Sequence, residues 1–182
     1  MGCDIHLYVE TFDPIKGCWV FCPDVEYDWR NYDAFAILAD VRNGSGFAGC
    51  KTGDGFVPIS DQKGVPTDMS NEVRSSAEHW RGYGHSFSWL TLEELLAYDW
   101  TQTTTKQGMV DKEAAQRFRE TGELPNSWCG WTNAPGYETI RWPITYKDAA
   151  GAFYTKTLPE LQKLADEHGG PKNVRIVFWF DN

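Results

Sequence analysis

The sequence predicts a single α+β domain with several helices, long functional loops and a mixed or mainly antiparallel sheet that includes the N- and C-terminal strands. At 182 residues the chain is long enough for one domain with a substantial core. Residues 2–10 alternate apolar and polar side chains, as a strand with one buried face does. Residues 173–180 form an apolar, aromatic run that suits a central strand. Strands at both ends with helical patterns between them favour the α+β class.

The first part of the chain is expected to contain a hairpin followed by helices. Residues 13–17 include Pro and Gly and have the composition of a turn, and residues 18–22 form the returning strand. Residues 32–41 have apolar side chains at helical spacing, and Asn31 directly before them is a suitable N-cap. A short helix is expected at 71–80.

Two loop segments, residues 44–54 and 57–70, separate these helices. They contain several Gly and Pro residues and lack the periodicity of a helix or strand. Loops of this length inside a compact domain are often lids or ligand clamps. We therefore expect them to rim a ligand pocket, with Asp68 or Ser70 reaching it.

The second half of the chain carries start signals for three helices and a pattern of two strands. A capping box, Thr-Leu-Glu-Glu, opens residues 91–100, and a second one, Thr-Leu-Pro-Glu, opens residues 157–170. Another helix is expected over 111–122, where Asp begins it and Gly ends it. Residues 140–147 and 152–156 are expected to be strands around a turn.

Composition and charge exclude some classes of function. A formal net charge of −9 argues against non-specific DNA or RNA binding, because polyanions repel each other. It still permits a small nucleotide held by a few Arg or Lys side chains, or an acidic protein that occupies a nucleic-acid-binding partner. Nine Trp exceed the needs of a core of this size, so some are expected to line a groove where rings stack on a ligand.

Cysteine usage and the start of the chain predict the compartment. Five Cys is an odd number, and the sequence does not open with a basic region followed by an apolar one. No apolar span of membrane length is visible either. We therefore expect free thiols in a reducing cytoplasm and no membrane partner.

The first strand presents an unusual polar face. Alternation places Asp4, His6, Tyr8 and Glu10 on one side and the apolar residues on the other. An acid, an imidazole, a phenol and a second acid in one row suggest a site that shares a proton, a metal ion or a ligand. The same alternation turns Cys3 away from His6, which argues against a nucleophilic Cys–His pair.

A second polar cluster, with His85 and Ser86, lies just before residues 91–100. If His85 converges with His6, the two imidazoles could act as the acid and base that cleave a phosphodiester. With Asp4 they could instead hold a divalent metal ion that activates water, so the cofactor stays open. Neither His is followed two residues later by the Ser or Thr of the two-histidine phosphoesterases, which disfavours that family.

Other side chains could hold a phosphate or an aromatic ligand. Arg30 and Arg42 bracket the helix predicted at 32–41, although a cation at Arg42 is also what a helix C-terminus prefers. Neither a P-loop nor a dinucleotide fingerprint is present. The predicted ligand-binding residues are Tyr8, Arg30, Tyr32, Arg42, Asp68, Ser70, Ser86 and Trp89.

The opening Met-Gly-Cys-Asp-Ile-His resembles the start of a family of small, mostly uncharacterised bacteriophage proteins. Residues 30–42, 64–70 and 85–90 are similar to further segments of that family, so the resemblance covers about the first half of the chain. The resemblance implies a phage context, the cytoplasm of an infected bacterium and a probable site, but no particular reaction.

Three functions follow as hypotheses. The first is an enzyme that cleaves the phosphodiester of a nucleotide immune signal to counter host defence, with His6, His85 and Asp4 as its catalytic residues. The second is a sponge that binds such a nucleotide without chemistry. The third is an acidic inhibitor of a host defence effector. The concentration of Asp, His and Ser in the first strand and the His85 segment favours a small-ligand site over the third hypothesis. A homo-oligomer is compatible with each of the three hypotheses.

Overall fold

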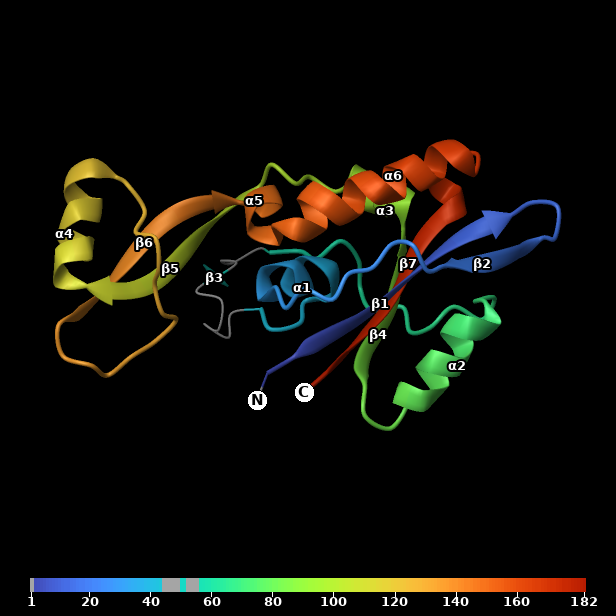
Figure 1. Ribbon diagram of the computed structural model, residues 1–182, viewed down its shortest axis with the longest axis horizontal. Helices are drawn as coiled ribbons and strands as arrows, with labels where there is room; N and C mark the ends of the chain where they lie inside the picture. Colours follow the sequence, from blue (N-terminus) through green and yellow to red (C-terminus); the bar gives the residue numbers. More distant parts are fainter. Residues whose placement is uncertain (1, 44–49, 52–55) are drawn as a thin grey trace.

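The computed structural model of the protein describes residues 2–43, 50–51 and 56–182 (Figure 1). Its central element is a four-stranded antiparallel sheet with the order β2-β1-β7-β4. The strands are β1 (Asp4–Asp13), β2 (Cys18–Cys22), β4 (His85–Thr91) and β7 (Val174–Asp181). The N-terminal and C-terminal strands therefore lie side by side in the middle of the sheet, as the sequence predicts.

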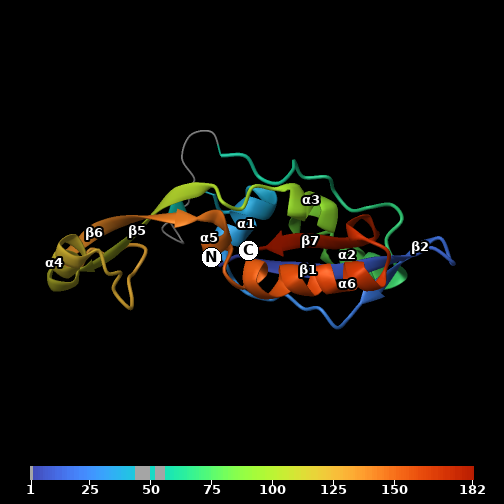
Figure 2. The ribbon, with the colours of Figure 1, turned by 90° about the horizontal axis from the view of Figure 1, so that it is seen from above.

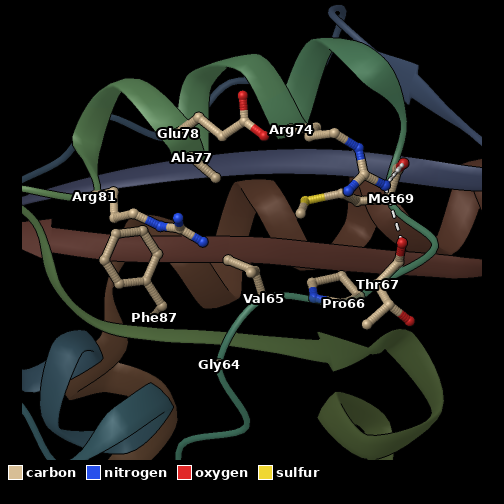
Figure 3. A pocket seen from close by; sticks show the side chains of 10 residues that line it. All are labelled: Gly64, Val65, Pro66, Thr67, Met69, Arg74, Ala77, Glu78, Arg81 and Phe87. Carbon is tan, nitrogen blue, oxygen red and sulfur yellow. Dashed lines mark hydrogen bonds between the residues drawn. The ribbon is translucent and has the colours of Figure 1, made fainter.

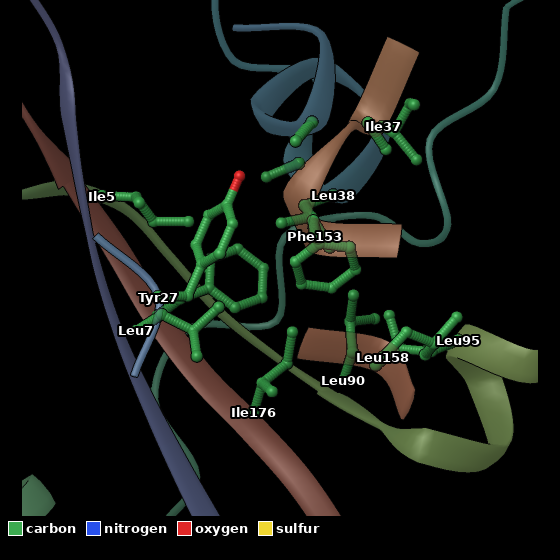
Figure 4. Close-up of a cluster of buried hydrophobic side chains, with 14 of the residues drawn as sticks. Ile5, Leu7, Tyr27, Ile37, Leu38, Leu90, Leu95, Phe153, Leu158 and Ile176 are labelled. Atoms are coloured by element: carbon green, nitrogen blue, oxygen red, sulfur yellow. The ribbon is translucent and has the colours of Figure 1, made fainter. Parts of the chain in front are cut away.

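One face of this sheet carries the main hydrophobic core (Figure 4). The alternation in β1 turns Ile5 and Leu7 to this side, where they join Ile176 and Phe178 of β7. Four helices contribute apolar side chains to the same core. They are α1 (Tyr32–Ala39), α3 (Leu92–Ala97), α5 (Tyr146–Ala150) and α6 (Leu158–Glu167). Removing this apolar surface from water is the main driving force for the fold.

The opposite face of the sheet is covered by one helix, α2 (Asn71–Trp80). Val73 and Ala77 of this helix pack against Val177 and Trp179 of β7 in a second, smaller cluster. The two faces of β7 are both buried, which explains why residues 176–180 are apolar without alternation.

A second antiparallel sheet has the order β3-β5-β6, and its helix α4 packs against it. These elements are β3 (Cys50–Lys51), β5 (Thr103–Asp111), α4 (Lys112–Thr121) and β6 (Tyr137–Thr145). Figures 1 and 2 show β5, β6 and α4 extending away from the first sheet to one side. Ala115 of α4 meets Val110, Ile140 and Trp142 in a third cluster. Within the described ranges, no helix is long and apolar enough to cross a membrane.

The α+β class, the hairpin and most predicted helices are confirmed. Residues 152–156 are predicted as a strand, and this is wrong, because a π-helical turn, Phe153–Thr157, joins α5 to α6 there. The hydroxyl of Thr145 accepts a hydrogen bond from the Asp148 amide and so starts a helix where the sequence suggests a turn. The patterns predict neither β4 nor β5, and the helix expected over 91–100 ends earlier, at Ala97.

Candidate functional site

The polar face of β1 lies under α2, and His6 and Tyr8 also line a cavity of about 280 Å³ beside the segment 21–28. The ring of His6 is centred 4.1 Å from that of Trp80 and 6.0 Å from that of Trp179. The hydroxyl of Tyr8 shares a 2.6 Å hydrogen bond with the hydroxyl of Ser76 on α2. Both side chains are only partly exposed, so this row serves mainly as the packing surface for the helix.

His85 lies on the other face of the sheet. In the strand register His6 pairs with Trp179, whereas His85 pairs with Phe180, and neighbouring residues of β7 point to opposite faces. His85 Nδ1 is 3.0 Å from the Ser86 hydroxyl, and its Nε2 is 3.0 Å from Asn182 Nδ2. The prediction that the two imidazoles face one pocket is therefore wrong, and an acid–base pair of these two side chains is not assembled.

Of the proposed metal ligands, Asp4 and His6 share one face of β1, and His85 lies apart from both. Asp4 receives two hydrogen bonds from Arg30, at 2.7 and 2.6 Å, and Arg30 holds the pKa of the Asp4 carboxyl below its usual value. The nearest carboxylate to His6 Nε2 is that of Asp181, at 3.5 Å. In the part of the chain that the structure describes, no group of three His, Cys, Asp or Glu residues is arranged to hold a metal ion.

Asp68 and Ser70 are attached to a buried ion pair, and Asp68 itself is mostly exposed. Arg175 donates to Glu10 at 2.7 Å and to Asp68 at 2.8 Å. Ser70 is the N-cap of α2, and its own amide donates to Glu10 at 2.6 Å. Trp19 also donates to Asp68 through its indole nitrogen, at 3.1 Å. This network fixes the segment before α2 and gives both predicted ligand residues a structural role.

The remaining predicted ligand residues are distributed over the molecule. Arg42 donates to the carbonyl of Gly2 and to the side chain of Asn182, and so connects the two ends of the described chain. Trp89 packs on the α2 side of the sheet, with Lys63 Nζ 4.3 Å above its ring. Arg30 and Tyr32, by contrast, both line one cleft.

This cleft, called here the Asp33 cleft, has a volume of about 430 Å³ and lies between α1, α5 and β5. It is built on the N-terminus of α1, where the Asn31 side chain accepts hydrogen bonds from two helix amides and donates to the Ala149 carbonyl. Its lining consists of Tyr27, Trp29, Arg30, Asn31, Tyr32, Asp33, Lys106, Ala149 and Ala152.

Two buried polar atoms of the Asp33 cleft have no hydrogen-bond partner among the described residues. They are Asp33 Oδ1 and the hydroxyl of Tyr27. The other oxygen of Asp33 accepts from Lys106 Nζ at 2.7 Å, and this ion pair is largely buried. Burial also raises the pKa of Tyr27 far above its ordinary value, so its phenol keeps its proton. Unpaired buried polar atoms cost free energy, and a ligand that pairs with them recovers it.

The cleft also carries positive charge and an aromatic rim. Lys106 uses one of its three donors on Asp33, and Arg30, which is paired with Asp4, also lines the cleft. The ring of Trp29 is 54% exposed, and Lys156 Nζ lies 5.1 Å from its centre. Lys156 therefore adds a cation at this ring, whereas the charges of Lys106 and Arg30 are each paired with a carboxylate.

Sequence reasoning identified Arg30 and Tyr32 but missed Asp33, Lys106, Tyr27 and Trp29. Asp33 has the ordinary position of an acid in the first turn of a helix, so its sequence context gives no sign of a ligand role. Lys106 lies in a strand that the patterns do not predict. The cluster of Tyr, Trp, Arg and Asn at residues 27–32 is the one signal that could have indicated the cleft.

Comparisons with protein-family models, with curated proteins and with solved structures find no match to this chain. The chemistry of the Asp33 cleft is therefore the basis for a functional assignment. Its features are an unpaired carboxylate oxygen, a neutral phenol, cations and an exposed indole.

Proposed function

We propose that the protein binds a nucleotide-like small molecule in the Asp33 cleft and holds it without cleaving it. The observation that carries the proposal is the unpaired, buried Asp33 Oδ1 beside Lys106 in the cleft wall. A carboxylate oxygen in this position needs an N–H or O–H donor, and the ring or amino N–H of a nucleobase supplies one.

The other parts of a nucleotide match the rest of the lining. Lys106 keeps two donors beyond its bond to Asp33, and Arg30 keeps its Nη1 group beyond the two bonds to Asp4, so both can donate to a phosphate. The exposed indole of Trp29 offers a face on which a base can stack, which contributes roughly 1–3 kcal/mol per base. A volume of about 430 Å³ is within the range of about 300–1,000 Å³ that is typical of small-molecule sites.

Binding without cleavage is the better of the two small-ligand hypotheses. Phosphodiester cleavage by His6 and His85 requires that both imidazoles reach the same bond. His6 lies between Trp80 and Trp179 under α2, and neither His lines the Asp33 cleft. The carboxylate and phenol of the cleft are instead suited to recognition.

The resemblance of the opening segment to bacteriophage proteins supports a biological setting for such binding. A protein that captures a nucleotide immune signal in the cytoplasm of an infected bacterium lowers its free concentration without needing turnover. We include this sponge role in the proposal, with cyclic dinucleotides and cyclic ADP-ribose isomers as the first ligands to test.

The proposal is tested by incubating the protein with each of these nucleotides and separating the protein from free ligand. Chromatography of the bound fraction before and after heat denaturation then shows whether the ligand returns intact. We expect intact ligand in about equal amount to protein. Appearance of a cleavage product with wild-type protein would support the enzyme hypothesis instead, and failure of every nucleotide to bind would overturn the proposal.

Two variants locate the binding. Trp29→Ala removes the exposed ring and is expected to weaken affinity about tenfold or more, since tenfold corresponds to about 1.4 kcal/mol. Asp33→Asn keeps the size of the side chain but replaces the free carboxylate oxygen, and a comparable loss is expected. Trp131→Ala is the matched control, because this ring is also highly exposed and lies outside the cleft. Melting temperatures show that each variant is folded.

A further inference from the structure

A second cavity, called here the α2 groove, lies between α2 and the segment 64–67 (Figure 3). Its volume is about 390 Å³, and its lining shares no residue with the Asp33 cleft. Met69, Ala77 and Phe87 supply apolar surface from three different parts of the chain. Apolar side chains that line a cavity of this size favour an occupant with an apolar body.

Two arginines on one face of α2 border the groove. Arg74 and Arg81 are seven positions apart, which is about two helical turns, so both side chains project to the same side. Arg74 donates to the carbonyls of Thr67 and Met69, which leaves its charge without a carboxylate partner. Among the described residues, the Arg81 guanidinium has no hydrogen bond or ion pair.

The orientation of the charged side chains makes the groove positive. Figure 3 shows the Arg81 guanidinium reaching over the cavity between Phe87 and Val65. Glu78, the acidic side chain of the lining, is placed higher on the helix, with its carboxylate turned away from Phe87. A cation beside apolar walls attracts an anion more strongly than a cation that is fully in water.

We infer that the α2 groove is a second binding site, which takes an amphipathic organic anion with an aryl or acyl body and a carboxylate, sulfonate or phosphate head. The apolar body packs on Met69, Ala77 and Phe87, and the head pairs with Arg81 and the free donors of Arg74. This site is independent of nucleotide binding in the Asp33 cleft.

The groove is formed before any ligand arrives. The Gly64 amide donates to the Phe87 carbonyl at 2.9 Å, which attaches one end of the 64–67 wall to the edge of β4. The other end is held by the ion pair between Asp68 and Arg175 and by the Ser70 cap of α2. A rigid site avoids the entropic cost of ordering a loop when the ligand binds.

Two dyes with similar apolar bodies test the charge recognition. One is 8-anilinonaphthalene-1-sulfonate, an aromatic anion, and the other is N-phenyl-1-naphthylamine, which lacks the sulfonate. Fluorescence titration of wild-type protein should show the sulfonate binding at least tenfold more tightly than the neutral dye, since a charge-assisted hydrogen bond contributes that much. Equal affinity for the two dyes would overturn the inference.

Arginine variants assign this preference to the groove. Arg81→Gln is expected to reduce the ratio of the two affinities to about threefold or less, and Arg74→Gln is expected to reduce it as well. Arg117→Gln on α4 is the matched control, because Arg117 is also an exposed helical arginine and no side-chain partner is present for it among the described residues. Similar effects of the substitutions at 81 and 117 would show that the preference does not arise in the α2 groove.

A charge placed at the rim gives a second, independent test. Val65 is partly exposed at the groove, so Val65→Glu leaves the core intact and should weaken sulfonate binding about tenfold by repulsion. Val57→Glu is its control, since Val57 is exposed and lies outside the groove. If Trp29→Ala abolishes dye binding and Val65→Glu does not, the dye occupies the Asp33 cleft and the inference of a second binding site is wrong.

Discussion

Arg175 is a cation that the fold encloses almost completely. It is 2% exposed, it pairs with the fully buried Glu10, and its guanidinium lies 3.9 Å from the centre of the Trp19 ring. Taking one partner from such a pair leaves a buried charge without compensation. We therefore expect Arg175→Met to reduce the free energy of unfolding by about 3–5 kcal/mol in urea titrations.

A double-mutant cycle separates the contribution of the ion pair to stability from the contribution of side-chain packing. Arg175→Met combined with Glu10→Met removes both buried charges, and much of the lost stability should return because the one partner left, Asp68, is mostly exposed to water. A double variant that is less stable than Arg175→Met alone would show that the ion pair is not the reason for the loss.

The ion pair between Asp4 and Arg30 predicts a pH dependence. Because Arg30 lowers the pKa of Asp4 in the folded state, the pair stabilises the protein fully above the unfolded pKa, near 4, and its contribution is lost as pH falls through the lower folded value. The difference in melting temperature between wild type and Asp4→Asn should therefore be largest near neutral pH and disappear in acid. Both side chains are half exposed, so the difference should be small and should shrink with added salt.

Among the elements, α2 depends on a defined N-terminus. The Ser70 hydroxyl accepts from the Val73 amide, and the helix covers the polar face of β1. Ser70→Ala should cost about 0.5–2 kcal/mol in free energy of unfolding, as is usual for a lost N-cap. Ser75→Ala on the exposed side of the same helix is the control and should change stability little. Equal effects of the two substitutions would argue against a capping role.

The β5–β6 strand pair requires a glycine at position 108, because a larger residue would clash with a neighbouring side chain. A Cβ atom at Gly108 would lie 2.5 Å from Cδ1 of Trp128, whose ring meets Trp142 edge to face. Gly108→Ala should therefore destabilise the protein by about 1–3 kcal/mol through overpacking. In a Trp128→Ala background the same substitution should cost clearly less, because the ring atoms are gone and only the Cβ at position 128, at 3.0 Å, remains close. Chemical denaturation of the four proteins measures both effects.

The elements show how far local patterns determine the fold. The hairpin and the helix starts at Asn31, Thr91 and Asp111 depend on neighbouring residues, and such features can be predicted. The predicted capping box at Thr157 is wrong, because Thr157 is itself helical and its side chain makes no capping bond. The π-helical turn at Phe153–Thr157 has β-branched and aromatic residues that suit a strand, and tertiary packing on the core overrides this preference. β4 carries a bulge where Ser86 has a φ of 53°, so its alternation is interrupted.

At the scale of the whole molecule, the same limits apply to the candidate site. The sequence correctly indicates that β1 has an apolar and a polar face, but not that α2 covers the polar one. Asp33 and Lys106 are far apart in the sequence, and they meet only because α1 packs beside the second sheet. The two polar clusters predict that His6 and His85 converge, and only the strand register shows that this prediction is wrong.

The adjacency of β1 and β7 has a consequence for biosynthesis. Asp4 pairs with Asp181, so the middle of the main sheet joins segments from opposite ends of the sequence, and closing so large a loop is entropically costly and slow. On a translating ribosome, β1 emerges well before β7, and its apolar face stays uncovered until β7 has been made. Nascent chains that lack β7 should therefore be sensitive to protease and dependent on chaperones, and protection should appear only after residue 181 has left the exit tunnel.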